Sequence, residues 1–204
     1  MIAPRAEIWN ERYRAMTGEP PAPAAVLAEN AHLLPRQGAA LELACGRGGN
    51  ALLLARLGFV VTARDQSDVA IENLQRAAAS EDLSLVAEVA DVEHLPWPPG
   101  YFDVIVVSRY LYRAMAPVII ARLAEGGLLF YQTYTADKPQ GTGPKNPEYL
   151  LAPNELLRLF GDLEVRYYRE DSSCGDLSSG RRNEAYFVGQ KIRPAFREPR
   201  RKEP

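Results

Sequence analysis

The sequence has few of the residues that most often carry metal or covalent chemistry. Its 204 residues include two cysteines, Cys45 and Cys174, and two histidines, His32 and His94. Two cysteines cannot form a disulfide framework, and no Cys/His spacing typical of a zinc site is present. We therefore expect no metal site. Because no general base is identifiable beside Cys45, we interpret it as a small turn residue rather than a nucleophile.

Long apolar runs and a surplus of basic residues are also missing. No stretch approaches the roughly 18 apolar residues of a membrane-spanning helix, and no apolar run typical of a signal peptide follows the first residues. The chain has 24 Lys and Arg against 26 Asp and Glu, which gives a net charge of −2. This balance argues against a nucleic-acid-binding protein. The sequence predicts a cytoplasmic protein whose partners include neither a membrane nor a nucleic acid.

The most informative stretch is an apolar run that breaks into glycines and resumes as a helical pattern. Residues 40–44 predict a buried strand, Gly46 and Gly48 a tight turn, and residues 51–57 a helix that ends before Gly58. Glycine lets the backbone approach a ligand closely, and the start of a helix offers unpaired N–H groups. This arrangement is typical of a cofactor-binding turn.

Three carboxylates distinguish between two kinds of cofactor. The glycine spacing alone also fits the pyrophosphate turn of nicotinamide enzymes. However, Glu42 lies within the first strand, Asp65 ends the second and Asp91 follows the third. A buried carboxylate needs a cation or a hydrogen-bond donor, and an acid at Asp65 can accept both ribose hydroxyls. Three acids suit S-adenosylmethionine, with its ammonium, sulfonium, ribose and adenine amine, better than they suit NAD.

These residues resemble the three cofactor motifs of class I S-adenosylmethionine-dependent methyltransferases. The motifs are residues 41–50 (Leu-Glu-Leu-Ala-Cys-Gly-Arg-Gly-Gly-Asn), 63–67 and 90–92. The Cys-Gly-x-Gly-x-Asn form and residues 9–13 (Trp-Asn-Glu-Arg-Tyr) are similar to the small bacterial branch that includes tellurite-resistance and thiopurine-type methyltransferases. One departure is Ala44, where the family usually has glycine. Because alanine is the smallest possible change, we expect cofactor binding to survive it.

The resemblance implies which residues bind the cofactor. In such enzymes an acid at the position of Asp91 accepts from the adenine amine, and an N-terminal segment like the one with Trp9 and Tyr13 covers the cofactor. Ser108 opens the segment that should meet the departing methyl. The predicted cofactor-binding residues are Tyr13, Glu42, Ala44, Cys45, Gly46, Gly48, Asn50, Asp65, Gln66, Asp91, Val92 and Ser108. No catalytic residue is predicted, because the sulfonium activates its own methyl group.

Alternating strands and helices over short loops predict an α/β protein with a parallel sheet and helices on both faces. Further strands are expected over residues 59–63, 83–90, 101–107 and 128–134, and further helices over 6–16, 22–34, 68–80, 112–124 and 153–160. Residues 162–169 and 184–191 predict a terminal antiparallel hairpin. The resemblance implies the Rossmann-like class I methyltransferase fold, with a mostly parallel seven-stranded sheet.

One domain is expected over residues 1–192, followed by a disordered tail over 193–204, which has little apolar content. The Gly/Pro-rich run 135–147 is longer than a typical connection, which favours a mobile lid or binding loop. The sequence does not indicate an oligomeric state.

The predicted function is methyl transfer from S-adenosylmethionine to a small-molecule acceptor. No obvious base is present, which favours a thiol, a metalloid oxyanion or another soft nucleophile. Arg47, Arg109 and Arg113 are candidates to hold an anionic acceptor. Two alternatives stay open: a nicotinamide-dependent oxidoreductase, and a non-catalytic S-adenosylmethionine-binding partner protein.

One motif match is interpreted as accidental. Tyr134 and Lys138 have the Tyr-x-x-x-Lys spacing of short-chain dehydrogenases, in which the pair stands one helical turn apart. Here Tyr134 belongs to a predicted strand, and the prolines and glycines after Lys138 exclude a helix.

Overall fold

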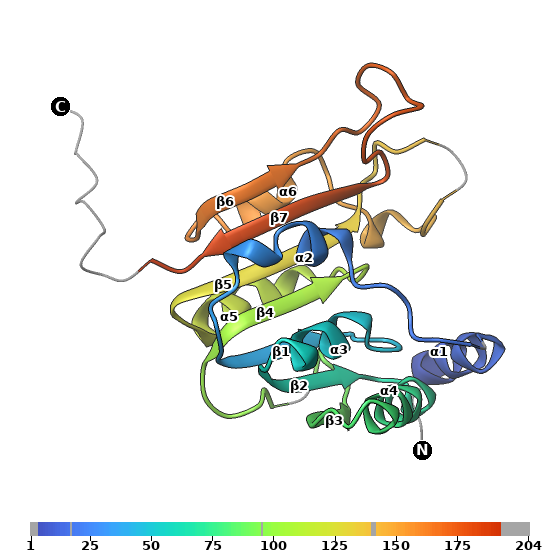
Figure 1. The fold of residues 1–204 in the computed structure, drawn as a ribbon. Coiled ribbons are helices and arrows are strands. Elements are labelled where there is room, and N and C mark those ends of the chain that lie inside the picture. Colours follow the sequence, from blue (N-terminus) through green and yellow to red (C-terminus); the bar gives the residue numbers. More distant parts are fainter. Residues whose placement is uncertain (1–3, 17, 95, 140–141, 193–204) are drawn as a thin grey trace.

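One seven-stranded sheet runs through the molecule, with helices on both faces (Figure 1). The computed structural model describes residues 4–16, 18–94, 96–139 and 142–192, so the predicted tail lies outside the described residues. The strands are β1 (Ala39–Leu43), β2 (Val60–Asp65), β3 (Leu85–Val89), β4 (Phe102–Ser108), β5 (Leu123–Tyr134), β6 (Glu164–Arg169) and β7 (Glu184–Gln190).

The strand order is β3-β2-β1-β4-β5-β7-β6. Strands β1 to β5 are parallel, and β7 is antiparallel to both β5 and β6. This order confirms the predicted fold class and the terminal hairpin, and it places β4 directly beside β1. Tyr134 ends β5 and Lys138 lies in the loop beyond it, so the match to the dehydrogenase pair is indeed accidental.

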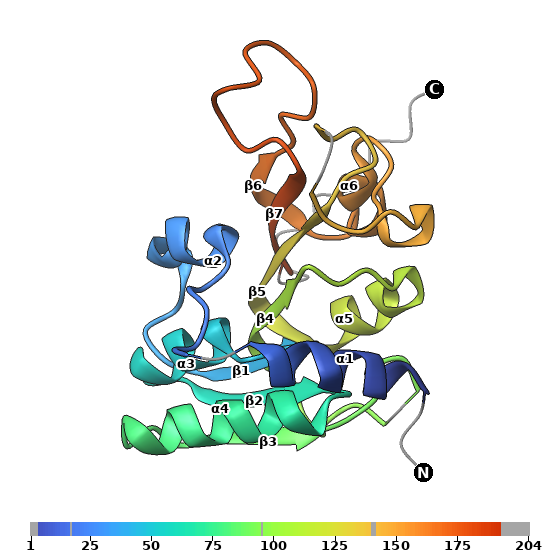
Figure 2. The ribbon, with the colours of Figure 1, turned by 90° about the vertical axis from the view of Figure 1, so that its right-hand side faces the viewer.

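Helices cover the two faces of the sheet in two groups (Figure 2). They are α1 (Pro4–Ala15), α2 (Ala25–Glu29), α3 (Gly49–Arg56), α4 (Asp68–Ser80), α5 (Ala116–Arg122) and α6 (Glu155–Leu159). Short 3-10 turns occupy Ala31–Leu33, Arg113–Met115 and Pro147–Tyr149. Helices α2, α3 and α4 pack on one face of the sheet, and α5 and α6 on the other. None of the helices described has the length and apolar character needed to cross a membrane.

The alternation of β1 assigns its side chains to the two faces. Leu41 and Leu43 pack in the apolar cluster beneath α5 and α6, while Ala40 packs in the cluster beneath α2, α3 and α4. Glu42 shares the face of Ala40, since residues two apart in a strand point to the same side. The Glu42 carboxylate therefore points toward the start of α3.

Helix α4 has the predicted bounds, because its first turn is capped by the Ser67 side chain, which accepts from the N–H of Ala70 at 3.1 Å. The prediction for α1 is wrong in its faces. The helical spacing of apolar residues over 6–16 predicts an amphipathic helix with Ile8 and Met16 on its apolar side, but they are 54% and 51% exposed. The buried side consists of Ala6 and Asn10, because α1 packs against α4 rather than against the sheet.

Two helices are shorter than predicted. The pattern over 22–34 forms α2 and a separate 3-10 turn. The pattern over 112–124 forms a helix only from Ala116, where a proline occupies the first turn, and it ends at Arg122. Strand β5 begins at Leu123, which pairs with Phe102, so Gly126 and Gly127, which separate the predicted helix from the predicted strand, lie inside β5. At Gly127 a Cβ would lie 2.9 Å from the carbonyl oxygen of Phe102, which explains the glycine at this irregular pairing.

The carboxyl ends of the parallel strands share one edge of the sheet. Figure 2 looks onto this edge and shows α1 lying across it, with the loops after β5 and β6 rising beside it. In open α/β sheets, this is the edge at which ligands bind.

Candidate cofactor site

The glycine turn between β1 and α3 is packed tightly on two sides. Gly46 and Gly48 have φ of +54° and +79°, where side chains are disfavoured. A Cβ at Gly48 would lie 2.3 to 2.9 Å from the Leu74 side chain, and one at Gly46 would lie 2.8 Å from the Tyr13 hydroxyl. The side of the turn near Tyr13 therefore presents bare backbone, as the sequence predicted.

Ala44 also lies in the left-handed region, with φ of +53°. This conformation explains why the family usually has glycine here, since a Cβ in it costs about 1 kcal/mol. The turn closes with this residue in place, because the N–H of Cys45 donates to the carbonyl of Arg64 at 2.9 Å and that of Gly48 to the carbonyl of Cys45.

Glu42 is buried, with 1% of its surface exposed. Its Oε1 accepts from Asn50 Nδ2 at 2.7 Å, and its Oε2 accepts from the N–H of Ala51 at 2.8 Å. Burial raises the pKa of Glu42 to about 8, although these two donors lower it. Both carboxylate oxygens of the buried Glu42 therefore accept a hydrogen bond, and these bonds connect β1 to the start of α3.

Asp65 lies on the opposite side of the same turn. It is 5% exposed and accepts from the N–H of Gly46 at 2.8 Å and of Ser67 at 2.9 Å. Burial raises the pKa of Asp65, and the backbone donors oppose this rise. Two buried carboxylates thus flank the glycine turn. Such a site favours a cationic ligand and disfavours a pyrophosphate, so the residues present fit S-adenosylmethionine.

The third acid is placed differently. The Asp91 side chain is 46% exposed and accepts from the N–H of Glu93 at 3.0 Å, and it lies 3.0 Å from Nδ1 of His94. It is nonetheless close to the turn in the sheet, because the N–H of Ala90 donates to the carbonyl of Asp65 at 2.8 Å. Glu42 and Asp65 therefore form a buried pair, and Asp91 lies at the rim. Gln66 and Val92, the predicted neighbours of the two strand-end acids, are half-buried.

Tyr13 comes to the turn from α1. Its ring stacks on Trp9 with the centroids 5.8 Å apart, and its hydroxyl lies against Gly46. Burial and the nearby Asp65 carboxylate raise the pKa of Tyr13. Helix α1 is held in place by Asn10, whose Oδ1 accepts from the Ser67 hydroxyl at 2.5 Å. Of the two aromatics expected to cover the cofactor, Tyr13 is the one that reaches the turn.

Asn50, one of the predicted cofactor-binding residues, connects four segments, and this connecting role was not evident from the sequence. Its Nδ2 donates to Glu42 and, at 3.2 Å, to the Ser108 hydroxyl at the end of β4. Its Oδ1 accepts from the N–H of Ala24 at 2.7 Å, just before α2. Ser108 is thereby placed at the site as predicted. Nothing in the local pattern around Asn50 signals these distant partners.

Cys45 is buried in the turn, and burial raises the pKa of its thiol. Such a thiol stays protonated near neutral pH, which agrees with its interpretation as a turn residue. Within the residues that the structure describes, no cluster of three or more His, Cys, Asp or Glu is arranged to hold a metal ion.

The three candidate arginines differ in what their guanidinium groups contact. Arg47 donates to the carbonyls of Gly18 and Glu19, which fastens the segment before α2. Arg113 makes a two-point ion pair with Glu155 and donates to two further carbonyls. Arg109 makes one ion pair through Nε. The prediction for Arg113 as an anion-holding residue is wrong, since all three of its guanidinium nitrogens already bind protein oxygens. Arg47 binds protein oxygens through Nη2 alone, so its role stays a prediction.

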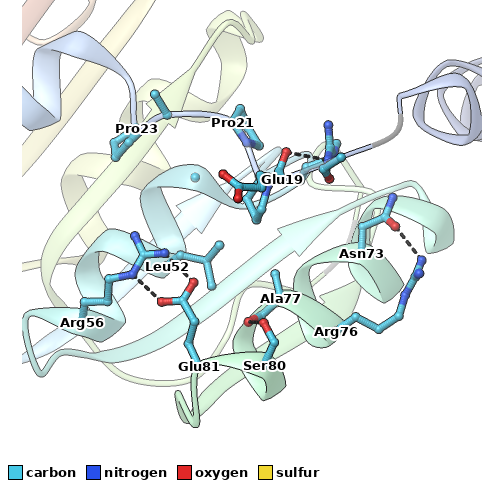
Figure 3. A pocket seen from close by; sticks show the side chains of 15 residues that line it. Glu19, Pro21, Pro23, Leu52, Arg56, Asn73, Arg76, Ala77, Ser80 and Glu81 are labelled. Atoms are coloured by element: carbon cyan, nitrogen blue, oxygen red, sulfur yellow. Dashed lines mark hydrogen bonds and ion pairs between the residues drawn. The ribbon is translucent and has the colours of Figure 1, made fainter.

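A cavity of about 580 Å³ lies behind the glycine turn, between α3 and α4 (Figure 3). Its lining includes Arg47, Gly49 and Arg76 together with a paired Arg56 and Glu81. It includes none of the predicted cofactor-binding residues. Because a Cβ at Gly49 would lie 2.4 Å from the carbonyl oxygen of Pro21, the turn and the cavity are separated by packed backbone.

Comparison with known proteins agrees with this site. A sequence family described as a methyltransferase domain matches residues 40–125. The chain is 30% identical over 164 residues to a probable S-adenosyl-L-methionine-dependent methyltransferase, TehB, of Haemophilus influenzae. That match covers 76% of this chain and 54% of TehB, so the chain spans about half the length of the curated relatives it matches.

Solved structures share the fold. The crystal structure of TehB from Haemophilus influenzae has a TM-score of 0.66 at 19% identity, over 92% of this chain and 67% of that chain. A structure described for the conversion of a disulfide bond into a thioacetal group during echinomycin biosynthesis has a TM-score of 0.68 at 22% identity, over 92% and 91% of the two chains. Taken with the glycine turn and its flanking acids, these matches show a methyltransferase domain over residues 40–125 and a chain that is similar to the TehB-like branch of the S-adenosylmethionine-dependent methyltransferases.

Proposed function

We propose that the protein transfers a methyl group from S-adenosylmethionine to a small-molecule acceptor. The observation that carries this proposal is the pair of buried carboxylates, Glu42 and Asp65, on either side of a turn of bare backbone. A cationic methyl donor favours the ionised form of two such carboxyl groups, whereas the pyrophosphate of a dinucleotide opposes it. This argues against the nicotinamide-dependent alternative.

The residues divide the binding of the cofactor among them. By the family resemblance, Asp65 binds the ribose hydroxyls and Asp91 binds the adenine amine. The glycine turn and Tyr13 contact the rest of S-adenosylmethionine. The bound cofactor supplies a methyl group that its sulfonium has already activated. The task left to the chain is to align the acceptor and exclude water, and such positioning supplies several kcal/mol of rate acceleration.

The acceptor is a soft or already ionised nucleophile, such as a thiol or a metalloid oxyanion. This part of the proposal follows from the state of the nearby hydroxyl groups. Burial raises the pKa of Tyr13, Tyr110 and Tyr131, so these phenols stay protonated near neutral pH and cannot act as bases. Glu42 is occupied by two donors. An acceptor that needs no proton removed suits such a site.

Calorimetry with S-adenosylhomocysteine, S-adenosylmethionine and NAD tests the cofactor. The first two should bind, and Gly48→Val and Asp65→Ala should each weaken binding by at least about tenfold, because the turn loses its shape or its carboxylate. Glu164→Ala, on the exposed edge strand β6, serves as the control. Unchanged affinity in both variants, or binding of NAD alone, would refute the assignment.

A panel of small thiols, selenite and amines, assayed by release of S-adenosylhomocysteine, then tests transfer. Release with a thiol or an oxyanion supports the proposed acceptor class, whereas release with amines alone contradicts it. Cofactor binding without release from any acceptor favours the non-catalytic binding protein. The cytoplasmic location and the absence of a nucleic-acid partner remain predictions from composition.

A further inference from the structure

We propose that Arg109 anchors the acceptor and that the acceptor carries a carboxylate apart from the atom that is methylated. The inference rests on the proposed function and adds the substrate class to it. It follows from the way in which one guanidinium group is fixed at the binding edge of the sheet while its outer end stays open.

Arg109 immediately follows β4, one residue beyond Ser108. Its N–H donates to the carbonyl of Gln132 on β5 at 2.7 Å, and its φ is +53°, a conformation that non-glycine residues seldom adopt. Strained backbone of this kind persists where its surroundings determine it, and it is concentrated at functional sites. The residue is therefore held at the carboxyl edge, next to the serine that Asn50 connects to the cofactor site.

The side chain is anchored through a buried network. Arg109 Nε donates to Glu184 Oε1 at 3.0 Å, and Glu184 is only 11% exposed. Glu184 Oε2 accepts from Gln132 Nε2 at 2.6 Å, and Gln132 Oε1 accepts from the N–H of Val26 at 2.9 Å. Since Gln132 is 1% exposed, the position of the ion pair is set by the protein interior rather than by solvent.

The outer end of the guanidinium is open. Within the residues described, neither terminal nitrogen of Arg109 has a protein partner, and the side chain is 62% exposed. Arg113 provides the contrast, because its Nε and Nη2 both bind Glu155. Two parallel N–H groups on a fixed guanidinium match the two oxygens of a carboxylate.

Two tyrosines lie near the Arg109 guanidinium. Tyr134 pairs with Glu184 across β5 and β7, and Tyr186 lies on the same face two residues further along β7. Lys138 lies over the Tyr134 ring, 5.5 Å from its centroid, and donates to the carbonyl of Pro144 at 2.8 Å. Its charge adds to the positive potential, while its donors are directed at the loop.

Arg109 takes no part in the bond changes. The nucleophilic atom of the acceptor forms a bond to the methyl carbon, and the bond from sulfur to that carbon breaks with its electron pair going to sulfur. The products are the methylated acceptor and S-adenosylhomocysteine. The carboxylate stays ionised throughout, so Arg109 exchanges no proton and acts by positioning.

Binding of benzoate and of benzamide to protein saturated with S-adenosylhomocysteine tests the inference. Benzoate should bind the wild-type protein more tightly than benzamide does, and Arg109→Met should weaken benzoate about tenfold while leaving benzamide unchanged. Arg109→Lys should lie between, because an ammonium keeps the charge without the paired donors. Arg122→Met, at the opposite edge of the sheet, is the matched control.

The outcomes separate this inference from the function on which it rests. If S-adenosylhomocysteine fails to bind, the proposed function is wrong. If it binds, but benzoate fails to bind or binds the wild type and Arg109→Met equally, only the role of Arg109 is refuted. Sulfate that binds as tightly as benzoate would overturn the assignment to a carboxylate.

Discussion

The two ends of the binding edge are held in different ways. Around the glycine turn, buried side chains meet backbone groups, as Glu42 does at Ala51 and Asp65 at Gly46. At the other end of the edge, around the loops that follow β4, β5 and β6, where we propose that the acceptor binds, long basic side chains bind loop carbonyls. We call this part the acceptor end. Arg113 donates to the carbonyls of Glu148 and Leu150. In the loop between β6 and β7, the guanidinium of Arg182 donates to carbonyls on both arms of the loop.

This difference indicates how such a protein can keep its cofactor site constant while its acceptor site varies. At the glycine turn, which we call the cofactor end, Glu42, Asn50 and Asp65 are buried and have defined partners, so a change to one of them disturbs the turn itself. In the acceptor end, exposed guanidinium groups determine the shape of the loops, and one or two substitutions can reshape them while the sheet stays intact. The predictions below test this contrast in order of decreasing effect.

The largest effect is expected from Gly48→Ala. The new Cβ would clash with the Leu74 side chain, and alanine would have to adopt the positive φ of this position. The free energy of unfolding should therefore fall by about 2 kcal/mol more than in Gly58→Ala. Gly58 has a similar φ of +86° but open space around it. Urea denaturation measures both variants. Equal losses in the two would show that the turn is not closely packed.

Asp65→Asn should be next. An amide can accept from only one of the two N–H groups of Gly46 and Ser67, so stability should fall by about 2 kcal/mol and affinity for S-adenosylhomocysteine should fall with it. Asp91→Asn, at the exposed rim, should change stability by less than about 0.5 kcal/mol. Thermal unfolding and calorimetry of both variants compare the buried acid with the exposed one. A larger loss of stability and affinity in Asp91→Asn than in Asp65→Asn would contradict this prediction.

The pKa of Glu42, raised to about 8, gives the cofactor end a pH dependence. Because the folded pKa lies above the ordinary value of 4.5, the free protein should lose stability as the pH rises from about 4.5 to 8. A cationic ligand favours the ionised carboxylate, so the affinity for S-adenosylmethionine relative to S-adenosylhomocysteine should rise severalfold, at most about tenfold, from pH 7 to 9.

Calorimetry at several pH values measures this ratio, and the neutral thioether of S-adenosylhomocysteine controls for the shared amino group. Glu42→Gln should flatten the dependence. A ratio that stays constant with pH in the wild type would contradict the placement of the sulfonium near Glu42.

Arg113→Met probes the acceptor end. It removes the two-point ion pair with Glu155 and the bonds to two loop carbonyls, on a side chain that is 41% exposed. Stability should fall by about 1 kcal/mol, and the affinity for S-adenosylhomocysteine should stay within about twofold. Thermal unfolding measures the loss of stability, and calorimetry measures the affinity for S-adenosylhomocysteine. A large loss of cofactor affinity would show that the two ends are not separable.

The smallest effect is expected from Ala44→Gly. Removing the Cβ relieves the left-handed conformation, and this gain exceeds the added chain entropy of glycine by about 0.5 kcal/mol. Urea denaturation should show a slightly higher midpoint with unchanged binding of S-adenosylhomocysteine. A lower midpoint would mean that the alanine methyl makes contacts that outweigh its strain.

The sequence predicts those parts of the molecule in which the signal is local. Strand β1, the glycine turn and helix α4 follow from adjacent residues, and α4 has the predicted bounds because Ser67 caps it. Helix α5 was predicted too long, because the pairing of Leu123 with Phe102 depends on a distant strand. The exposed Ile8 shows the same limit, since the face that α1 buries is set by α4.

In the site, the strand-end acids were predictable from their positions, but the connecting residues were not. Asn50 and Gln132 are single amides within a helix and a strand, and all of their partners except Glu42 are 26 to 106 residues away. The three arginines looked alike in the sequence. Only the structure distinguishes them: within the part of the chain that it describes, Arg113 binds protein oxygens through all three nitrogens, Arg47 donates to the segment before α2, and Arg109 keeps two open nitrogens at the carboxyl edge of the sheet.

Helix α2 depends on both ends of the binding edge for its existence. Its five residues are too few to be stable alone, and two N–H groups at its start donate to distant amides, that of Ala24 to Asn50 on α3 and that of Val26 to Gln132 on β5. The helix is thus stabilised only once α3 and β5 have come together. Slow hydrogen exchange at these two N–H groups should therefore report this assembly, and their early exchange would mark its first opening.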